Sequence, residues 1–181
     1  MTCIVGKVDP RTQKVIIGAD SLASSANHKM IREDKKTFKK GDFIFGCCGS
    51  YRMMQLLRFK LEIPSVKDKE VFEYMCTDFI DAIKKCFEVG EYGKKKDNEV
   101  EGGTFLVGYK NRLFKIQSDF QVSESKHYFN ACGSGRDYAL GSLYSSLVSE
   151  EKNTIAVLDK ALSCATVFSP TVGGEFSYVS T

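Results

Sequence analysis

The sequence predicts an α+β fold in which two antiparallel sheets lie face to face and carry a pair of helices on each outer side. Strand-like and helix-like segments come in separate runs along the chain, in the order strands, two helices, strands, two helices, strand. The strand-like segments are short, rich in Val, Ile and Phe, and bounded by turn residues, which is typical of hairpins. This order favours a four-layer αββα sandwich over alternating βαβ units.

Two pairs of strands are expected near the start of the chain. Residues 2–8 and 13–19 are rich in Val and Ile, and Pro10 lies in the turn between them. A second pair is expected at residues 36–40 and 42–48. The latter strand is almost wholly apolar, as expected when both faces of a strand are covered.

Two helices follow these strands. Ser50 is placed to cap the first helix, which carries Met53, Leu56 and Leu57 towards Pro64. The second helix is expected over residues 68–88, where the apolar residues recur at helical spacing; they are Val71, Phe72, Met75, Phe79, Ala82, Ile83 and Phe87. The charged stretch that runs from there to Gly102–Gly103, with Lys94–Lys96 inside it, is predicted to be a solvated loop.

The second half of the chain is predicted to repeat the pattern of strands followed by two helices. Asn153 is the expected cap of the last long helix. We expect a hairpin at residues 104–109 and 112–117 and a single strand at 128–132. Two helices are expected at 136–148 and 154–168, and a closing strand at 176–179.

Length and composition bound the class of protein. A chain of 181 residues with 43% hydrophobic and 27% charged residues is expected to form one globular domain, residues 1–181. No apolar run reaches the ~20 residues of a membrane span, and the N-terminus lacks the pattern of a secretory signal. We therefore expect a cytoplasmic protein. A net charge of +3 gives no reason to expect a nucleic-acid partner.

The cysteines indicate reduced, buried thiols. They are odd in number, lie mostly in apolar segments and form no CxxC pair. With His28 and His127 the only histidines, the sequence predicts neither a metal site nor a cofactor, and Cys–His chemistry on His127 is a remote alternative. The seven cysteines are Cys3, Cys47, Cys48, Cys76, Cys86, Cys132 and Cys164.

Thr2 is the first candidate for chemistry. Removal of Met1 would give Thr2 a free α-amine beside its own hydroxyl, so that the amine could act as the base for attack by the hydroxyl oxygen. An α-amine titrates near pH ~8, and a neighbouring positive charge would keep much of it neutral. The alternative is that Thr2 is only a β-branched residue at the start of a strand.

Five segments in order along the chain carry a resemblance to a known family. They are Thr2 with Ile4–Val5, residues 16–21 (IIGADS), Lys36, residues 46–50 (GCCGS), and residues 131–135 (ACGSG) with 138–141 (YALG). Together the segments resemble the proteasome-type N-terminal nucleophile hydrolases, which include the bacterial HslV peptidase and the proteasome β subunits. The resemblance spans the chain and implies the αββα sandwich.

The resemblance also implies roles for individual residues. Asp20 and Lys36 would pair beside the Thr2 amine, although the neighbouring Lys35 competes for the lysine role. Ser134 would bond to the amine or to its water. The catalytic set is thus Thr2, Asp20, Lys36 and Ser134, with the N–H of Gly49 in the oxyanion hole and Cys48 and either Met30 or Ile31 lining the substrate pocket.

One feature departs from the family. Proteasome β subunits usually carry an aspartate near the end of the last helix, whereas residues 165–174 (ATVFSPTVGG) contain no acid. Thr166 or Ser169 is the expected replacement for its hydrogen bonds, but neither supplies its charge.

The function implied is a threonine endopeptidase that cleaves polypeptides inside a ring of its own copies. An AAA+ unfoldase is a possible partner, while no nucleic acid, membrane, metal or cofactor is expected. Two alternatives stay open at this point. One is a non-catalytic assembly module on the same fold, which the missing acid favours. The other is a small-molecule amidohydrolase, including one that uses Cys3 after further trimming.

Overall fold

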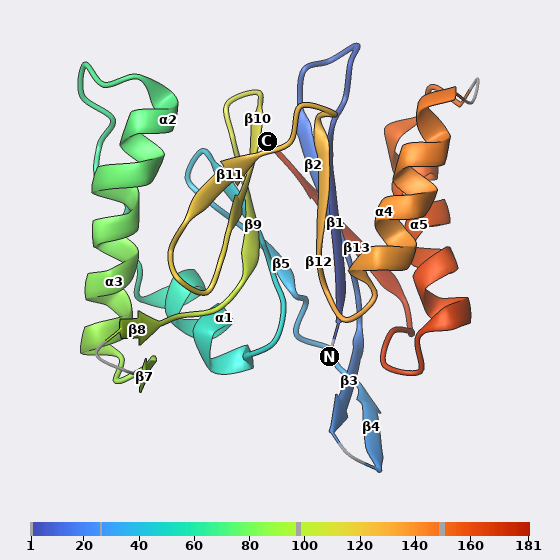
Figure 1. The fold of residues 1–181 in the computed structure, drawn as a ribbon, viewed down its shortest axis with the longest axis horizontal. Helices are drawn as coiled ribbons and strands as arrows, with labels where there is room; N and C mark the ends of the chain where they lie inside the picture. Colours follow the sequence, from blue (N-terminus) through green and yellow to red (C-terminus); the bar gives the residue numbers. More distant parts are fainter. Residues whose placement is uncertain (1, 26, 97–98, 149–150) are drawn as a thin grey trace.

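The computed structural model describes residues 2–25, 27–96, 99–148 and 151–181. Two antiparallel sheets lie between two layers of helices (Figure 1). The first sheet has the strand order β12 (Phe129–Gly133), β1 (Cys3–Val8), β2 (Val15–Asp20), β13 (Phe176–Ser180). The second has the order β11 (Val122–Glu124), β10 (Arg112–Ile116), β9 (Phe105–Tyr109), β6 (Phe43–Cys47), β5 (Thr37–Lys40).

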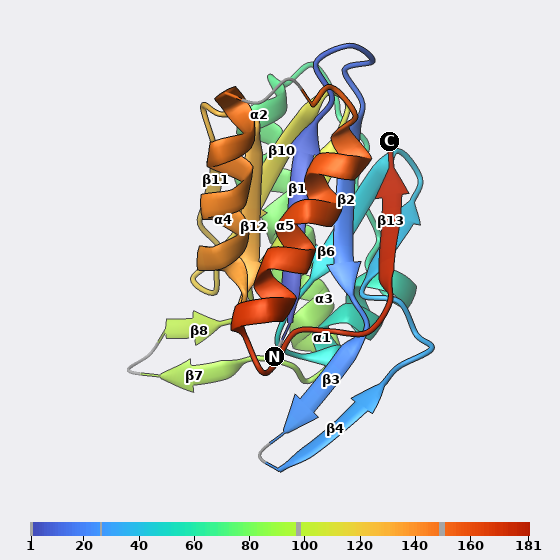
Figure 2. The same ribbon diagram turned by 90° about the vertical axis from the view of Figure 1, so that its right-hand side faces the viewer.

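The helices form the outer layers of the sandwich. Figure 2 shows α4 (Arg136–Ser145) and α5 (Thr154–Phe168) lying across the first sheet. The second sheet is covered by α1 (Tyr51–Phe59) and by a long helix that consists of α2 (Val71–Tyr74), a π-helical turn (Met75–Phe79) and α3 (Ile80–Val89). The four-layer αββα arrangement predicted from the sequence is therefore confirmed.

Side chains along β1 alternate between the two faces of the first sheet, so that this strand packs against both neighbouring layers. Cys3 and Val5 pack against the α4/α5 layer, whereas Ile4 and Val8 pack into the space between the two sheets. The sheets approach closely at Gly46, where an added Cβ would lie 2.5 Å from the side chains of both Ile4 and Ile17. A glycine is required here because any side chain would push the sheets apart.

Aromatic side chains fill the layer between the second sheet and its helices. The rings of Phe43 and Tyr109 stack with centroids 4.0 Å apart, and Phe43 also stacks on Phe79 at 5.3 Å. Phe38 and Phe45 stack at 4.8 Å on the same layer. This cluster anchors the long helix to the sheet.

The helix caps agree with the prediction. Ser50 Oγ accepts a hydrogen bond from Met53 N at 3.2 Å at the start of α1. Asn153 Oδ1 likewise accepts from Ile155 N at 3.0 Å at the start of α5. These local side-chain contacts explain why the two helix starts are readable from the sequence.

Several backbone expectations were wrong. The helix expected over residues 68–88 starts at Val71, because the Glu70 carboxylate caps it by accepting from Phe72 N at 2.7 Å. The helix expected over 136–148 ends at Ser145 and continues as a 3-10 turn (Ser146–Val148).

Three short pairings were not predicted. The segment predicted as a solvated loop pairs its backbone in a hairpin of β7 (Lys94–Lys96) with β8 (Glu99–Glu101). A second hairpin pairs β3 (Leu22–Ser25) with β4 (His28–Ile31), and all four residues of β4 are exposed. The third pairing is that of β11 with β10, which makes β11 the edge strand of the second sheet. These segments are only three or four residues long and contain no run of alternating apolar residues, so they leave no strand pattern in the sequence.

Five of the cysteine side chains are buried, Cys164 is partly exposed and Cys76 is exposed, so the expectation of buried thiols fails at Cys76. Cys76 lies on the solvent side of the π-helical turn (Met75–Phe79). Within the described ranges, we find no helix that is both long and apolar enough to cross a membrane.

Candidate active site

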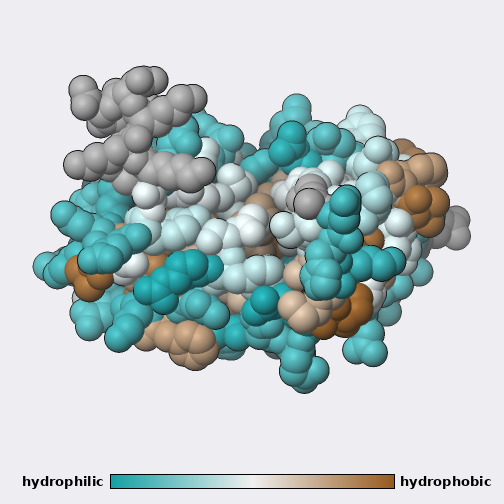
Figure 3. Space-filling view, turned by 90° about the horizontal axis from the view of Figure 1, so that it is seen from below, coloured by the Kyte–Doolittle hydropathy of each residue, from teal (hydrophilic) through white to brown (hydrophobic). Residues whose placement is uncertain are grey.

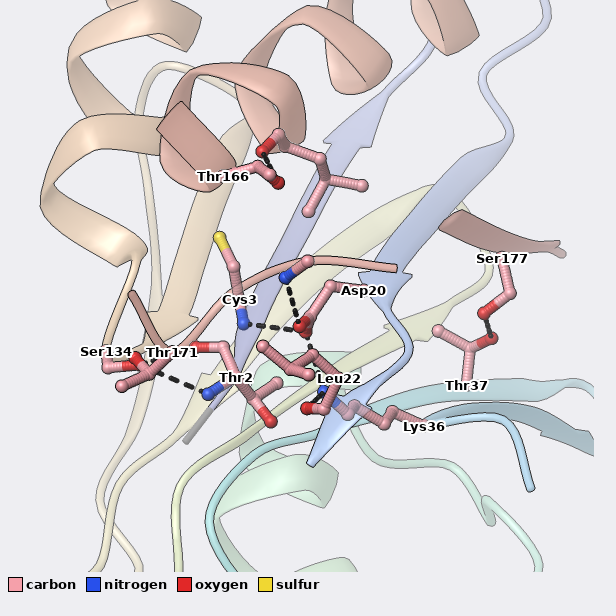
Figure 4. Close-up of polar contacts among 12 residues, drawn as sticks. Thr2, Cys3, Asp20, Leu22, Lys36, Thr37, Ser134, Thr166, Thr171 and Ser177 are labelled. Carbon is pink, nitrogen blue, oxygen red and sulfur yellow. Dashed lines mark hydrogen bonds and ion pairs between the residues drawn. The ribbon is translucent and has the colours of Figure 1, made fainter. Parts of the chain in front are cut away.

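Thr2 lies at the start of β1, at one end of the sandwich, with 3% of its surface exposed. Residues from distant parts of the chain surround it (Figure 4). The nitrogen of Thr2 donates a hydrogen bond to Ser134 Oγ at 3.1 Å, and Ser134 Oγ lies 3.3 Å from the Thr2 carbonyl oxygen. Met1, whose removal the sequence analysis expects, lies outside the described residues.

The pairing of β1 with β12 brings Ser134 to Thr2. Cys3 is the partner of Gly133 in this antiparallel register, so Ser134 immediately follows the last paired residue of β12. Gly133 has a φ of +94°, and an added Cβ would lie 2.1 Å from the Thr2 carbonyl oxygen. Only glycine fits this close approach, because both the backbone angle and the contact with a backbone atom exclude a side chain.

Asp20 and Lys36 form a buried ion pair beside Thr2. Asp20 ends β2, and its Oδ1 lies 2.7 Å from Lys36 Nζ, with at most 2% of either side chain exposed. Lys36 Nζ also donates to the carbonyl oxygen of Leu22 at 2.7 Å. Lys35, the competing candidate, is exposed.

The Asp20 carboxylate holds two further segments of backbone. Its Oδ1 accepts a hydrogen bond from Cys3 N at 3.0 Å, and its Oδ2 accepts from Gly173 N at 3.1 Å. Asp20 therefore fixes the residue after Thr2, the loop after α5 and the Lys36 ammonium relative to one another.

Burial controls the ionisation of two groups in the site. Desolvation lowers the pKa of Lys36, and the nearby Asp20 carboxylate opposes this shift. Desolvation, with a smaller contribution from Asp20, raises the pKa of the Cys3 thiol to about 12. The Cys3 thiol is thus protonated at neutral pH in the chain that retains Thr2.

A chain of hydroxyl groups leads away from Ser134. Ser134 Oγ lies 2.7 Å from Thr171 Oγ1, which in turn lies 3.0 Å from Ser169 Oγ. Ser169, one of the two residues expected to replace the missing acid, therefore reaches Ser134 through Thr171. Thr166, the other, does not join this chain, because its hydroxyl donates to Leu162 O at 3.0 Å within α5.

Thr171 and Gly173 were not predicted from the sequence. Both lie in the loop that follows α5, and neither belongs to a motif. The only available signal was that the expected acid is missing from a segment that still contains several hydroxyl residues.

A small pocket lies beside Thr2. Its lining includes Lys36, Cys48, Gly49, Tyr51 and Met54, together with Thr2 itself. Ile31 is not among the lining residues. It lies on the exposed strand β4, with 57% of its surface exposed. Tyr51 and Met54, from the first turns of α1, line this pocket but were not predicted from the sequence.

Two residues of this pocket have distinct environments. Gly49 has a φ of +86°, an added Cβ would meet no atom within 4 Å, and its N–H has no partner among the described residues. The ring of Tyr51 is covered by the Arg32 guanidinium, 3.8 Å from its centroid. The pocket thus combines an open backbone position with an aromatic wall.

The arrangement can support attack by the Thr2 hydroxyl on a carbonyl group. The hydroxyl residue, a buried cation and a backbone position open to the pocket meet in one place. No metal or cofactor is needed for this chemistry.

Comparisons with known proteins place this geometry in context. No family model matches the sequence, and no curated protein matches it either. Among solved structures, Thiobacillus denitrificans BPH in complex with epoxomicin is similar over 99% of this chain and 98% of its own, with a TM-score of 0.80 and 18% identity.

Two further solved structures are similar. HslV from Trypanosoma brucei covers 99% of this chain and 98% of its own, with a TM-score of 0.70 and 15% identity. Anbu from Hyphomicrobium sp. strain MC1 is similar over 99% of this chain and 82% of its own, with a TM-score of 0.66 and 12% identity. At these identities the likeness concerns the fold: the chain has the HslV/proteasome-like N-terminal nucleophile fold.

Proposed function

Because the chain has this fold, we propose that it is a threonine endopeptidase whose nucleophile is the Thr2 hydroxyl, exposed by removal of Met1. The observation that carries the proposal is the grouping of Thr2, Ser134 and the Asp20–Lys36 ion pair at one end of the sandwich. A non-catalytic module would have no chemical need for a buried lysine beside Thr2, so the Asp20–Lys36 pair favours the enzyme over that alternative.

Peptide hydrolysis would proceed in two steps. The Thr2 amine takes the proton of the Thr2 hydroxyl, directly or through water, as its oxygen attacks the scissile carbonyl carbon. The tetrahedral intermediate places its negative oxygen at the N–H of Gly49. Its collapse breaks the C–N bond, the ammonium of Thr2 protonates the leaving amine, and an ester on Thr2 remains. Water, deprotonated by the same amine, then hydrolyses the ester.

Lys36 would keep the Thr2 amine in its basic form. A positive charge lowers the pKa of a neighbouring amine, because it disfavours a second ammonium group. The Asp20 carboxylate holds Lys36 in place at 2.7 Å and partly offsets the burial of its charge. Ser134 would orient the amine through the contact of 3.1 Å that it makes with Thr2 N.

The hydroxyl chain explains how the site could work without the late acid. Thr171 and Ser169 give Ser134 a continuous set of hydrogen-bond partners, at 2.7 Å and 3.0 Å along the chain. Hydroxyl groups orient Ser134 but supply no charge, so we expect a slower enzyme than one with a carboxylate there.

We further propose that the protein acts on polypeptides in the cytoplasm as a ring of its own copies, with an AAA+ unfoldase as a possible partner. The resemblance and the fold support this assembly. Apolar side chains are also exposed at the C-terminal end of α5, Val167 at 75% and Phe168 at 62%. Figure 3 views this end of the molecule and shows apolar surface on its α4/α5 side.

The decisive experiment is the intact mass of the purified protein before and after incubation with a peptide epoxyketone such as epoxomicin. That group reacts with both the hydroxyl and the free amine of an N-terminal threonine. We expect a mass without Met1 and a single adduct, which Thr2→Ala abolishes and Thr12→Ala, on the exposed β1–β2 turn, leaves intact.

The other outcomes are equally clear. An adduct that persists in Thr2→Ala would exclude Thr2 as the nucleophile. Retained Met1 without an adduct would favour the non-catalytic module. Loss of Met1 without an adduct, together with turnover of a small amide, would favour the amidohydrolase.

A further inference from the structure

A second cavity lies at the other end of β1 from Thr2. It has a volume of about 800 Å³, is partly open to solvent, and is bordered by the β1–β2 turn, by the residues that precede β12 and by Ser146, Leu147, Glu151 and Lys152 between α4 and α5. Small-molecule sites in proteins commonly occupy ~300–1,000 Å³. None of its lining residues takes part in the candidate active site.

Lys7 is the residue that makes this cavity unusual. Cys3 and Val5 point into the layer between the first sheet and α4/α5, and the period of two places Lys7 on the same face. A lysine therefore occupies a position where the pattern calls for an apolar side chain. Its Nζ lies 5.8 Å from the centroid of the Phe129 ring.

The Lys7 charge is only partly compensated by the protein. The Lys7 ammonium forms no ion pair or hydrogen bond with any residue that the structure describes. Desolvation lowers the pKa of Lys7, and the more distant Asp9 carboxylate only partly opposes the shift. A half-buried cation without a partner is costly unless a bound anion completes it.

Among the residues that the structure describes, two acids lie near the cavity, and both are already engaged. Asp9 accepts hydrogen bonds from Arg11 N, Thr12 N and Thr154 Oγ1, each at 2.9 Å, and lies 3.9 Å from the Arg11 guanidinium. Glu151, which lines the cavity, accepts from Asn153 N at 2.6 Å. The lining also contains Arg11 and Lys152, so the charge of its described residues is positive on balance.

The rest of the wall is apolar and contains a strained residue. Leu147 and Val157 line the cavity together with Tyr128, whose ring is 68% exposed. Tyr128 has a φ of +61°, a conformation that bulky residues rarely adopt. It is held there by its hydrogen bond to Ser125 O at 3.1 Å and by that from Val8 N at 2.8 Å. Backbone strain of this kind is found preferentially at ligand-binding sites.

We propose that this cavity binds a small organic anion that has a carboxylate at one end and an apolar body at the other. The carboxylate pairs with the Lys7 ammonium, and the body packs between Tyr128, Leu147 and Val157. This site is independent of the peptidase activity proposed above, because its residues lie at the opposite end of β1.

The test compares two probes of the same shape on the full-length protein. Sodium 4-phenylbutyrate carries the carboxylate, whereas 4-phenylbutyramide replaces it with an uncharged amide. Binding is measured by calorimetry, and the shifted methyl signals are located by NMR. We expect the carboxylate to bind at least tenfold more tightly than the amide and to shift the methyl signals of Leu147 and Val157.

Variants locate the charge that is responsible. Lys7→Met keeps the length of the side chain and should weaken phenylbutyrate binding at least tenfold, while Lys7→Arg should retain it. Lys14→Met removes an exposed lysine from the same hairpin and should bind like the parent protein. Each variant is checked by its melting temperature.

Three results would overturn the proposal. They are equal affinity for the carboxylate and the amide, undiminished binding by Lys7→Met, and the absence of saturable binding up to about 10 mM probe, well above the ~1 mM dissociation constants of weak ligands. A folding failure of Lys7→Met would not rescue it, because the comparison of probes on the parent protein stands by itself.

Discussion

Lys36 Nζ lies 2.7 Å from Asp20 Oδ1 in an ion pair that is almost completely shielded from solvent. Asp20 also accepts hydrogen bonds from the backbone N–H groups of Cys3 and Gly173. One carboxylate therefore ties together the start of β1, the end of β2 and the loop after α5. Structure and proposed chemistry depend on the same residue.

Removal of the lysine should destabilise the fold. Lys36→Met leaves the Asp20 carboxylate buried without its cation, and such losses cost ~3–5 kcal/mol in the free energy of unfolding. Urea denaturation of the variant measures this. The matched control is Arg136→Met, which breaks the exposed pair of Arg136 with Asp137 and should cost less than ~1 kcal/mol. Equal costs for the two variants would contradict the importance of burial.

Removal of a hydroxyl from the Ser134 chain should slow the reaction moderately. Thr171→Val replaces the hydroxyl by a methyl group and deprives Ser134 of its contact at 2.7 Å. A neutral hydrogen bond contributes ~1 kcal/mol, so the rate of epoxyketone adduct formation should fall about fivefold. Thr166→Val is the matched control, because the Thr166 hydroxyl bonds within α5. A comparable slowing in the control would remove the hydroxyl chain from the mechanism.

Two glycines should respond in opposite directions to alanine. At Gly133, an added Cβ would lie 2.1 Å from the Thr2 carbonyl oxygen at a φ of +94°, so Gly133→Ala should cost at least ~1–3 kcal/mol and abolish adduct formation. At Gly141, inside α4, an added Cβ meets nothing within 4 Å. Gly141→Ala should therefore stabilise the protein by ~0.5–1 kcal/mol. Chemical denaturation of both variants checks the contrast in sign.

Stability should fall in acid through Asp9. The backbone N–H of Thr12 contributes most to lowering the pKa of Asp9 from 3.8 to about 2. Because the pKa in the folded state lies below that of the unfolded chain, this stabilisation is present above pH 3.8 and is lost as the pH falls towards 2. The melting temperature of Asp9→Asn should lie below that of the parent at pH 7, and the gap should close near pH 2. Asp137→Asn, at an exposed position, should show no such gap.

The sequence was most informative where structure is local. Ser50 and Asn153 cap helices through contacts within three residues, and the β1–β2 and β9–β10 hairpins join neighbouring segments. Apolar periodicity located the core strands and the long helices. It missed β3, β4 and β11 because these short strands bury little apolar surface.

The residues of the candidate site also fall into two groups, those that the sequence predicted and those that only the structure revealed. Thr2, Asp20, Lys36 and Ser134 belong to segments that resemble a family, and the fold brings them together at one end of the sandwich. Ile31 is not among the residues that line the pocket beside Thr2, whereas Tyr51 and Met54 are. The lining by Tyr51 and Met54 could not be predicted from a short segment, because it depends on how α1 is placed relative to β1.

By itself, the sequence determined the order of the main elements, the αββα class and the residues with the chemistry for acyl transfer, because these follow from local pattern and residue type. Only the tertiary structure decided which hydroxyls reach Ser134, which residues form the pocket wall, and that Lys7 lies half-buried without a partner. These are contacts between residues more than thirty positions apart, or environments created by several elements at once. Packing of the layers fixes them, and no periodicity along the chain encodes them.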